Sequence, residues 1–211
     1  MFIVVIIILL SCFMYELLYK DKINVPKKIW TYCDNCNSDI EWKKYTDYEI
    51  VVLTKKNCFH YINIPVEITS HPNFDVIFSD LVCLYALAEY GGIWIDYSVI
   101  LKAPLDWLFP KHAEFSGFYI ESKTPIIQNR LIACNKSPFI RLWKEEFIKI
   151  ANYVNVEKYV ESRKNMGVNL ENIRDPIYQA VQVAAQKVLQ IDKYPLDSLI
   201  LRKENTKKII F

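Results

Sequence analysis

The chain lacks a strong charge of either sign, since 26 basic and 24 acidic residues leave a net charge of +2 over 211 residues. A general nucleic-acid binder presents a concentrated basic stripe, so we expect no nucleic acid among the partners. We interpret the basic tail from Arg202 to Lys208 as a solvated end. The three histidines (His60, His71 and His112) lack the spacing of metal ligands and are interpreted as surface or loop residues.

The six cysteines do not form a zinc-finger pattern. Cys33 and Cys36 have the spacing of a ligand pair, but no second pair and no paired histidines follow at the required distance. No helical pattern begins at Cys33, which disfavours a thioredoxin-like redox site. The five cysteines beyond Cys12 are an odd number, so not all of them can pair. We therefore expect mostly reduced or buried thiols.

The segment from Phe2 to Leu18 is apolar for its first fourteen residues, and Glu16 is its first charged residue. The segment has no basic leader and no small-residue cleavage site, which disfavours a cleaved signal peptide and a lipoprotein at Cys12. An apolar surface without an amphipathic stripe disfavours a buried core helix. The segment is short for a bilayer span, for which about 20 residues are usual. We predict a transmembrane anchor over residues 1–19 and one domain over residues 20–211.

The rest of the chain alternates strand and helix patterns, which is typical of an α/β sheet. Strands are predicted at Lys28–Tyr32, Tyr48–Leu53, Ile93–Leu101, Phe115–Ile120 and Ile126–Cys134. Helices are predicted at Asp39–Tyr45, at Asp80–Tyr90 with Ser79 as its cap, from Ser137-Pro138 to about Val154, and from Asp175-Pro176 to about Gln190. We expect a turn or short helix at Pro104–Phe109 and a flexible excursion over Asn155–Arg174.

The segment YGGIWIDYSVIL, from Tyr90 to Leu101, holds two of the four glycines. Glycine tolerates positive φ, so Gly91-Gly92 predicts the end of a helix directly before a strand. Side chains alternate along a strand, which predicts that Asp96 and Ser98 share a face. A carboxylate inside an apolar strand is costly without a partner, which favours a function for Asp96. Such a group could bind a ribose hydroxyl, or a divalent cation that holds a diphosphate.

The chain resembles the sugar-binding DXD glycosyltransferases of the capsular polysaccharide synthesis family and related mannosyltransferases in the order of its motifs. These motifs are S-D, a helix, Y-G-G-I-W-I-D, V-I-L and P-L-D. PKKIWTY and DYEIVVLTKKN resemble the first two strands of that family. The resemblance extends from about Pro26 to about Gln190. It implies a GT-A-like single domain, with a mixed, mostly parallel sheet flanked by helices. A nucleotide-sugar donor would lie across the carboxyl ends of the strands, and a glycan or other molecule would accept the sugar.

The resemblance also implies a set of site residues. It assigns catalytic roles to Asp96, Asp80 and Asn129. It assigns donor binding to Asp80 and Asp96 as well, and to Trp30, Thr31, Gly91, Gly92, Ser98, Gln128 and Arg130. A Mn²⁺ or Mg²⁺ ion would be held by Asp96 and Ser98.

Three positions depart from the family pattern. Ser98 stands at the last position of the DXD motif, where a hydroxyl is a weaker ligand than a carboxylate. Cys83 stands where an arginine is usual, and Arg130 stands where a tryptophan is usual. These departures leave metal dependence open and keep a degenerate, non-catalytic sugar- or partner-binding protein as the alternative. A membrane-tethered interaction protein without a ligand is a further alternative.

Stereochemistry and membrane side also stay open. Family analogy favours retention of the anomeric configuration, although no nucleophile with a positioned partner stands out. Lysines at positions 20, 22, 27 and 28 follow the apolar segment, and the positive-inside rule places them in the cytoplasm. Family analogy instead places the domain of this single-pass protein in a lumen.

Overall fold

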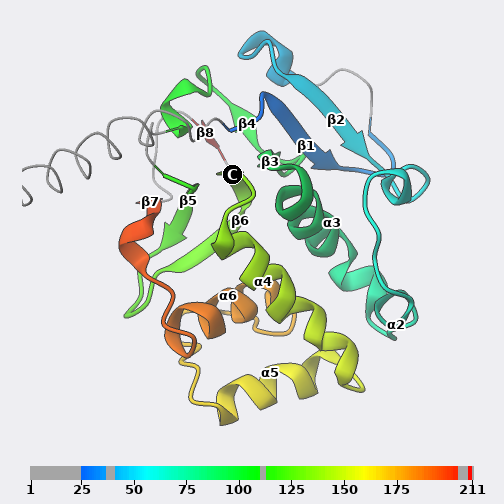
Figure 1. The fold of residues 1–211 in the computed structure, drawn as a ribbon, viewed down its shortest axis with the longest axis vertical. Coiled ribbons are helices and arrows are strands. Elements are labelled where there is room, and N and C mark those ends of the chain that lie inside the picture. The colour runs from blue at the N-terminus through cyan, green and yellow to red at the C-terminus, as the bar shows by residue number, and fades with distance from the viewer. Residues whose placement is uncertain (1–24, 37–40, 110–112, 204–208, 211) are drawn as a thin grey trace, which may run out of the picture.

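The computed structural model describes residues 25–36, 41–109, 113–203 and 209–210 (Figure 1). The strands are β1 (Lys28–Tyr32), β2 (Glu49–Leu53), β3 (Gly92–Ile95), β4 (Ile100–Leu101), β5 (Phe115–Ile120), β6 (Ile126–Cys134), β7 (Leu199–Lys203) and β8 (Ile209–Ile210). Six strands form a sheet in the order β2-β1-β3-β6-β5-β7, and β4 pairs with β8. In the large sheet β6 runs against the other five strands. The predicted mixed, mostly parallel α/β sheet is confirmed.

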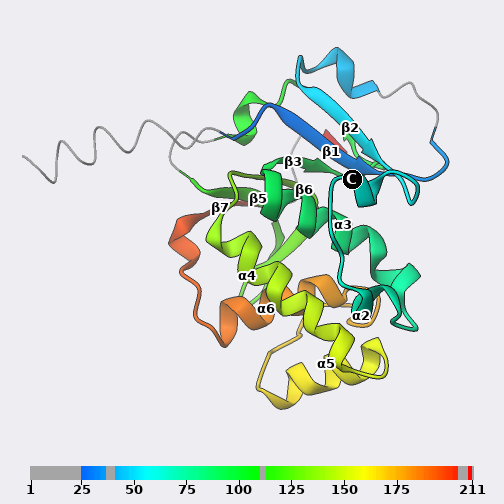
Figure 2. The same cartoon turned by 45° about the vertical axis from the view of Figure 1, so that its right-hand side comes forward.

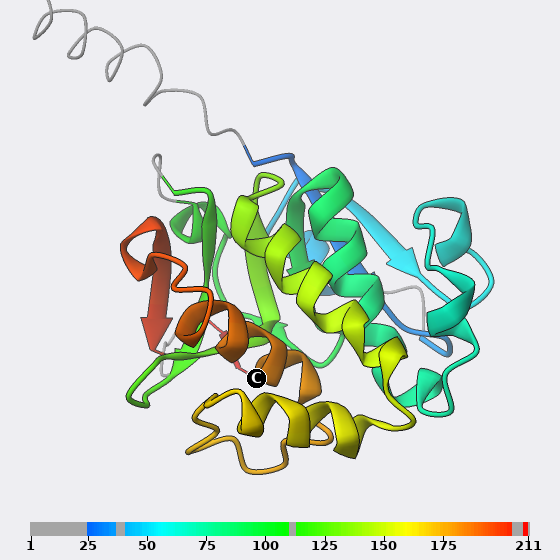
Figure 3. The ribbon, with the colours of Figure 1, turned by 60° about the horizontal axis from the view of Figure 1, so that its bottom comes forward.

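The helices pack mainly on one face of the sheet. The α-helices are α2 (Val66–Thr69), α3 (Phe74–Tyr90), α4 (Pro138–Phe147), α5 (Val156–Asn165) and α6 (Ala180–Gln190). Short 3₁₀ helices are η1 (Glu41–Lys44), η2 (Cys58–His60), η3 (Asp106–Leu108), η4 (Ile148–Asn152) and η5 (Leu196–Ser198). Figure 3 shows α3 and α4 side by side in front of the sheet, and α5 lies outside α6, away from the strands.

The two faces of the sheet bury different apolar clusters. The helix-covered face packs Trp30 and Trp94 against the interior of α3, α4 and α6. The opposite face packs Ile29 and Ile95 beneath η1, β4 and η3, and there the indole of Trp42 donates a hydrogen bond to the Val99 carbonyl at 2.8 Å. This alternation along β1 and β3 is the period-2 pattern of a strand buried on both faces. Figure 2 shows the sheet between these two layers.

The turn from α3 into β3 requires both of its glycines. Gly91 has φ +68° and ψ −162°, a conformation that is essentially restricted to glycine. Gly92 has φ +100°, and a Cβ atom there would lie 2.6 Å from the Lys28 carbonyl oxygen. The Trp30 indole donates to the Gly91 carbonyl at 2.9 Å. The predicted helix end at Gly91 is confirmed, and the glycine pair has a structural reason of its own.

Two predictions for the central segment are wrong. Helix α3 begins at Phe74, not at Asp80, because Phe74 and Phe78 pack against each other and extend the apolar face toward the N-terminus. Ser79 therefore lies inside the helix and does not cap it. The predicted strand Ile93–Leu101 is interrupted, since β3 ends at Ile95 and the Val99 amide donates to the Asp96 carbonyl at 2.9 Å. This turn abolishes the alternation on which a shared face for Asp96 and Ser98 depended.

The C-terminal half also differs from expectation in three places. The predicted flexible excursion contains α5, which is held by its buried Arg163. Helix α6 begins at Ala180, because the Asp175 carboxylate accepts hydrogen bonds from the Ile177 and Tyr178 amides and forms a turn before the helix. Arg202 is not a solvated end, since its guanidinium donates to the Ser116 hydroxyl and the Trp107 carbonyl.

Other elements follow their predictions. Strands β1, β5 and β6 have the expected bounds, and β2 begins one residue later. The Ser137 hydroxyl accepts from the Ile140 amide at 3.1 Å, and Pro138 opens α4, as the sequence predicts. The helix expected at Asp39–Tyr45 is a 3₁₀ turn, η1, over the residues that the structure describes, and its Trp42 is buried.

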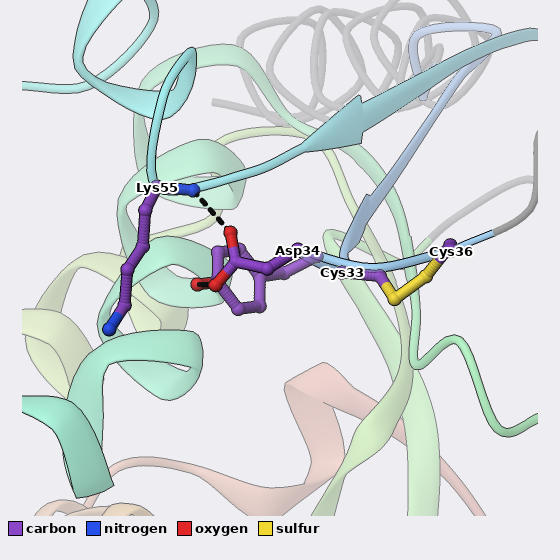
Figure 4. Close-up of a disulfide and its surroundings, with 5 residues drawn as sticks. Cys33, Asp34, Cys36 and Lys55 are labelled. Carbon is purple, nitrogen blue, oxygen red and sulfur yellow. Dashed lines mark hydrogen bonds between the residues drawn. A yellow bond between two sulfur atoms is a disulfide. The ribbon is translucent and has the colours of Figure 1, made fainter.

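Cys33 and Cys36 form a disulfide directly after β1, so the prediction of reduced thiols is wrong for this pair. Figure 4 shows the neighbouring Asp34 beside Lys55, whose backbone amide donates to the Asp34 carboxylate at 2.7 Å. The Tyr32 hydroxyl donates to the same carboxylate. The loop after β1 is therefore constrained both covalently and by hydrogen bonds. Three further cysteines, Cys58, Cys83 and Cys134, are free and buried, as expected.

The predicted anchor over residues 1–19 lies outside the described residues. Within residues 25–210, wherever the structure describes them, no helix has both the length and the apolar character of a bilayer span.

Candidate functional site

A polar pocket lies at the carboxyl end of β3. It has a volume of about 150 Å³ and lies between α3, β6 and the start of α6. Its lining residues are Val76, Ser79, Asp80, Asp96, Asn129, Arg130, Tyr178, Gln179, Val181 and Gln182. The crevice outside the carboxyl ends of the strands is the place where open α/β sheets bind ligands. We consider this pocket the candidate active site.

Asp80 reaches the pocket from the second turn of α3. Asn129 of β6 donates a hydrogen bond from its amide Nδ2 to Asp80 Oδ1 at 2.7 Å. Burial, and next the negative charge of Asp96, raise the pKa of Asp80 to about 8, and the bond from Asn129 offsets part of that rise. The residue is half-buried and lines the pocket. Asp80 is therefore poised to exchange a proton near neutral pH.

Asp96 enters the pocket from the turn after β3. Its backbone amide donates to the Arg130 carbonyl at 2.8 Å, which ties the turn to β6. The Trp94 indole donates to Asp96 Oδ1 at 3.1 Å. Burial raises the pKa of Asp96, while the Trp94 bond and the charge of Arg130 act in the opposite direction. The two carboxylates thus come from separate elements and face one pocket.

The wall opposite α3 comes from the start of α6. Tyr178 and Gln179 precede the helix, and Gln182 lies in its first turn. The sequence predicts a helix here but assigns no function to these residues. No local signal could have identified them, because about fifty residues separate them from Asn129, and only the packing of α6 on β6 brings them to the pocket.

The structure brings together four of the residues that the sequence singled out: Asp80, Asp96, Asn129 and Arg130. Ser98 lies exposed in the turn and does not line the pocket. Gln128 is buried behind the pocket, where its Oε1 accepts from Gln182 Nε2 at 3.5 Å.

The remaining predicted donor-binding residues lie away from the pocket. Gly91 and Gly92 are at the opposite end of β3, about 13–17 Å from Asp96 along an extended strand. Trp30 and Thr31 are fully buried inside β1, on opposite faces of the sheet, and neither lines the pocket. Burial explains the apolar character of the KIWTY strand without reference to a ligand.

The pocket fits a divalent cation only in combination with a ligand. Among the described residues, no cluster of three or more Asp, Glu, His or Cys side chains could hold a metal ion. Mg²⁺, however, is commonly held by one or two carboxylates together with substrate phosphates and water. Asp80 and Asp96 meet that requirement, and a cation would offset the charge of Asp96, which after burial is the second cause of the raised pKa of Asp80. Asp80 and Asp96 both line the pocket, whereas Ser98 of the predicted Asp96–Ser98 pair does not.

Residues 34–160 match the sequence profile of a family described as capsular polysaccharide synthesis protein. The match covers more than half of the chain. The protein belongs to the capsular polysaccharide synthesis family. Asp80, Asp96, Asn129 and Arg130 lie inside the matched segment, and the wall contributed by α6 lies beyond it.

No curated protein matches the chain. Among the solved structures that resemble it is the PaToxG glycosyltransferase, with 15% sequence identity and a TM-score of 0.47. The likeness covers 86% of this chain and 76% of that one.

Proposed function

We propose that this capsular polysaccharide synthesis protein is a glycosyltransferase that moves a sugar from a nucleotide-sugar donor to a glycan or other acceptor. One observation carries the proposal. Asp80 of α3 and Asp96 after β3 meet in a polar pocket at the carboxyl end of the sheet. Family membership supports the same reaction class, since polysaccharide synthesis requires sugar transfer.

Each pocket residue receives a role in this proposal. Asp80 and Asp96 would hold a Mg²⁺ or Mn²⁺ ion, which when bound would neutralise charge on the departing diphosphate. Arg130, at the rim beside Asp96, contributes positive charge toward the same group. Asn129 fixes the orientation of Asp80 through its hydrogen bond. The protein's contribution is therefore positioning and electrostatic stabilisation.

We also propose retention of the anomeric configuration, on the family resemblance alone. The two carboxylates are the acidic side chains that line the pocket, and both are assigned to the cation. Proton NMR of the freshly formed product distinguishes retention from inversion through the coupling constant of its anomeric proton.

The decisive experiment compares the wild-type protein with Asp96→Asn. Nucleotide-sugars and Mn²⁺ should raise the melting temperature of the wild type, and transfer or slow hydrolysis of the donor should be detectable. Asp96→Asn should lower turnover by about 10³-fold or more, a size typical of a lost electrostatic contact at the reacting centre. The variant should remain folded by circular dichroism. Retained turnover in a folded Asp96→Asn protein would refute the assignment.

The second candidate is a non-catalytic sugar- or partner-binding protein of the same family. Cys83 favours it, because this residue is buried in α3 and cannot supply the charge of the usual arginine. This candidate predicts nucleotide-sugar binding by calorimetry without turnover, with or without Mn²⁺. An interaction protein without any ligand is disfavoured by the polar pocket with two inward-facing carboxylates.

We further propose that residues 1–19 anchor the domain at a membrane, with the domain on the lumenal or extracellular side. The Cys33–Cys36 disulfide favours that side over the one suggested by the lysines, because disulfides persist in oxidising compartments. Protease protection of sealed vesicles distinguishes the two sides. Digestion of the domain from the cytoplasmic side would contradict this placement.

A further inference from the structure

The pocket wall formed by Tyr178, Gln179 and Gln182, here called the α6 wall, contains uncharged groups only. The opposite wall contains the two carboxylates. A cation and a diphosphate need charge, whereas sugar hydroxyls are recognised by neutral donors and acceptors. The two walls are thus chemically suited to two different parts of a nucleotide-sugar.

Gln182 lines the pocket, and one of its side-chain atoms is buried without a hydrogen-bond partner within the described residues. The side chain is only 4% exposed, and its Nε2 makes one long hydrogen bond of 3.5 Å to Gln128. Its Oε1 has no hydrogen-bond partner within the described residues. An unsatisfied buried acceptor is unfavourable, and native structures usually reserve such groups for a water or a ligand. A ligand hydroxyl that donates to this oxygen would remove the penalty.

Tyr178 stands at the mouth of the pocket with 73% of its surface exposed. Its backbone does not vary freely, because the Tyr178 and Ile177 amides both donate to Asp175 Oδ1, at 3.1 and 3.2 Å. The Asp175 amide in turn donates to Gln179 Oε1 at 3.2 Å. A large aromatic ring is therefore presented to solvent on a backbone turn that is held in place. Such a ring offers an apolar face to the C–H groups of a sugar.

We propose that the α6 wall selects the donor sugar. One sugar hydroxyl donates to Gln182 Oε1, and one face of the ring packs on Tyr178. The pocket volume of about 150 Å³ is smaller than the roughly 300–1,000 Å³ of pockets that enclose larger ligands, which suits a single sugar ring and leaves the nucleotide outside. The inference rests on the proposed function and adds the side chains that set its specificity.

The first test uses Gln182→Leu and measures how much affinity the sugar adds to that of the nucleoside diphosphate. Calorimetry with Mn²⁺ compares UDP with UDP-glucose, UDP-galactose and UDP-N-acetylglucosamine, and GDP with GDP-mannose. The measured quantity is the ratio of two affinities, that for the best-bound nucleotide-sugar and that for its nucleoside diphosphate alone. This ratio is the affinity contributed by the sugar. Gln182→Leu should reduce that ratio by about tenfold and leave nucleoside diphosphate affinity unchanged, as expected for a lost buried hydrogen bond. Discrimination between the UDP-sugars should decrease in parallel.

Gln186→Leu is the matched control. Gln186 lies one turn further along α6, is also buried, and donates to the Pro125 carbonyl at 2.7 Å without lining the pocket. Gln186→Leu should lower the melting temperature of the protein but leave the affinity contributed by the sugar unchanged. A purely structural role for Gln182 predicts the same behaviour for both variants.

Tyr178 provides an independent variant if Gln182→Leu does not fold. Tyr178→Ala should weaken nucleotide-sugar binding by about tenfold, while Tyr178→Phe, which keeps the ring, should bind as the wild type does. Ile177→Ala is the control, because this neighbour is exposed but lines a different surface groove. Wild-type protein that binds no nucleotide-sugar would overturn the proposed function. A different result would overturn only the role of the α6 wall: the wild type binds nucleotide-sugars, but the affinity contributed by the sugar is unchanged in Gln182→Leu. If Gln182→Leu is unfolded, the same comparison is made with Tyr178→Ala.

Discussion

Two buried carboxylate sites in this protein are built in opposite ways. Glu146 of α4 is 2% exposed, and its oxygens meet three cations: Arg163 at 2.6 Å, Lys149 at 2.9 Å and Lys187 at 3.3 Å. Asp80 and Asp96 share their pocket, and the hydrogen bonds described to their carboxylates come from a neutral amide and a neutral indole. The protein itself neutralises the first site with three cations, whereas the second has two carboxylates and one cation, Arg130, along its lining.

This difference separates a structural ion cluster from a functional one. Charges buried beside good partners join elements, and here they connect α4, α5 and α6. Two like charges facing one cavity are unfavourable until a cation or a proton joins them. Burial is the main cause of the raised pKa of Asp80, and the negative charge of Asp96 adds to it. Perturbed carboxylates in a cavity are typical of binding and catalytic sites.

The largest expected effect comes from the neutralised site. Glu146→Gln should lower the free energy of unfolding by about 3–5 kcal/mol, because it leaves Arg163 buried without its counter-charge. At this size the melting temperature should decrease by roughly 10 °C. Asp96→Asn, the equivalent change in the pocket, should not lower the melting temperature, because it removes one of two like charges. Glu145→Gln, on the exposed side of the same helix, is the control, and equal melting losses in the Glu146 and Asp96 variants would remove the distinction.

A second expected effect is the pH dependence caused by Asp80. Its folded pKa of about 8 lies above the unfolded value of about 3.9, so the folded state binds the proton more tightly. The resulting stability is fully present below about pH 4 and is lost as pH rises toward 8. Asp80→Asn should therefore gain stability relative to the wild type between pH 5 and pH 8, by an amount on the order of a few kcal/mol.

Urea unfolding at the two pH values measures this gain. Asp75→Asn provides the control, because Asp75 lies on the exposed surface of the same helix beside Lys55. A constant difference in stability between Asp80→Asn and the wild type across the range would show that the pKa of Asp80 is not raised.

A smaller effect on stability is expected from the Cys33–Cys36 disulfide, which follows the carboxyl end of β1. Reduction of Cys33–Cys36 should lower stability by about 2 kcal/mol, the chain-entropy expectation for so short a loop. Melting curves with and without dithiothreitol measure it. The double variant Cys33→Ser, Cys36→Ser should already melt at the reduced temperature and should not respond to the reagent. Reduction should leave the effect of Glu146→Gln unchanged, since the two sites share no element and distant sites are additive.

The smallest effect is expected at Ser98. Ser98→Ala should change stability by less than about 0.5 kcal/mol, as surface substitutions usually do, and kcat/KM by less than about twofold. The reason is its exposed place in the turn outside the pocket. The measurement uses the best donor from the calorimetric screen. A decrease in kcat/KM of tenfold or more in Ser98→Ala would indicate that Ser98 belongs to the metal site and that the site extends beyond the pocket described.

Sequence patterns predicted five of the six strands of the large sheet because those strands have strong signals, and they missed β7. β5 and β6 have the predicted bounds, and Ser137-Pro138 opens α4 as expected. The failures occurred where a local pattern competes with tertiary packing. YGGIWIDYSVIL reads as one apolar strand, but hydrogen bonding of the Asp96 turn to Arg130 ends β3 at Ile95. The polar segment after Asn155 reads as a loop, but the buried Arg163 holds it as a helix.

The sequence alone determined that Gly91-Gly92 ends a helix, that Asp96 is an unusual carboxylate after an apolar strand, and that Asp80 and Asn129 belong with it by family resemblance. Tertiary structure alone decided which side chains share the pocket. It excluded Ser98 through a turn and added Gln182 and Tyr178 through the packing of α6 on β6. The physical reason is that residue chemistry and short-range periodicity are local properties, whereas a pocket depends on the meeting of elements far apart in the chain.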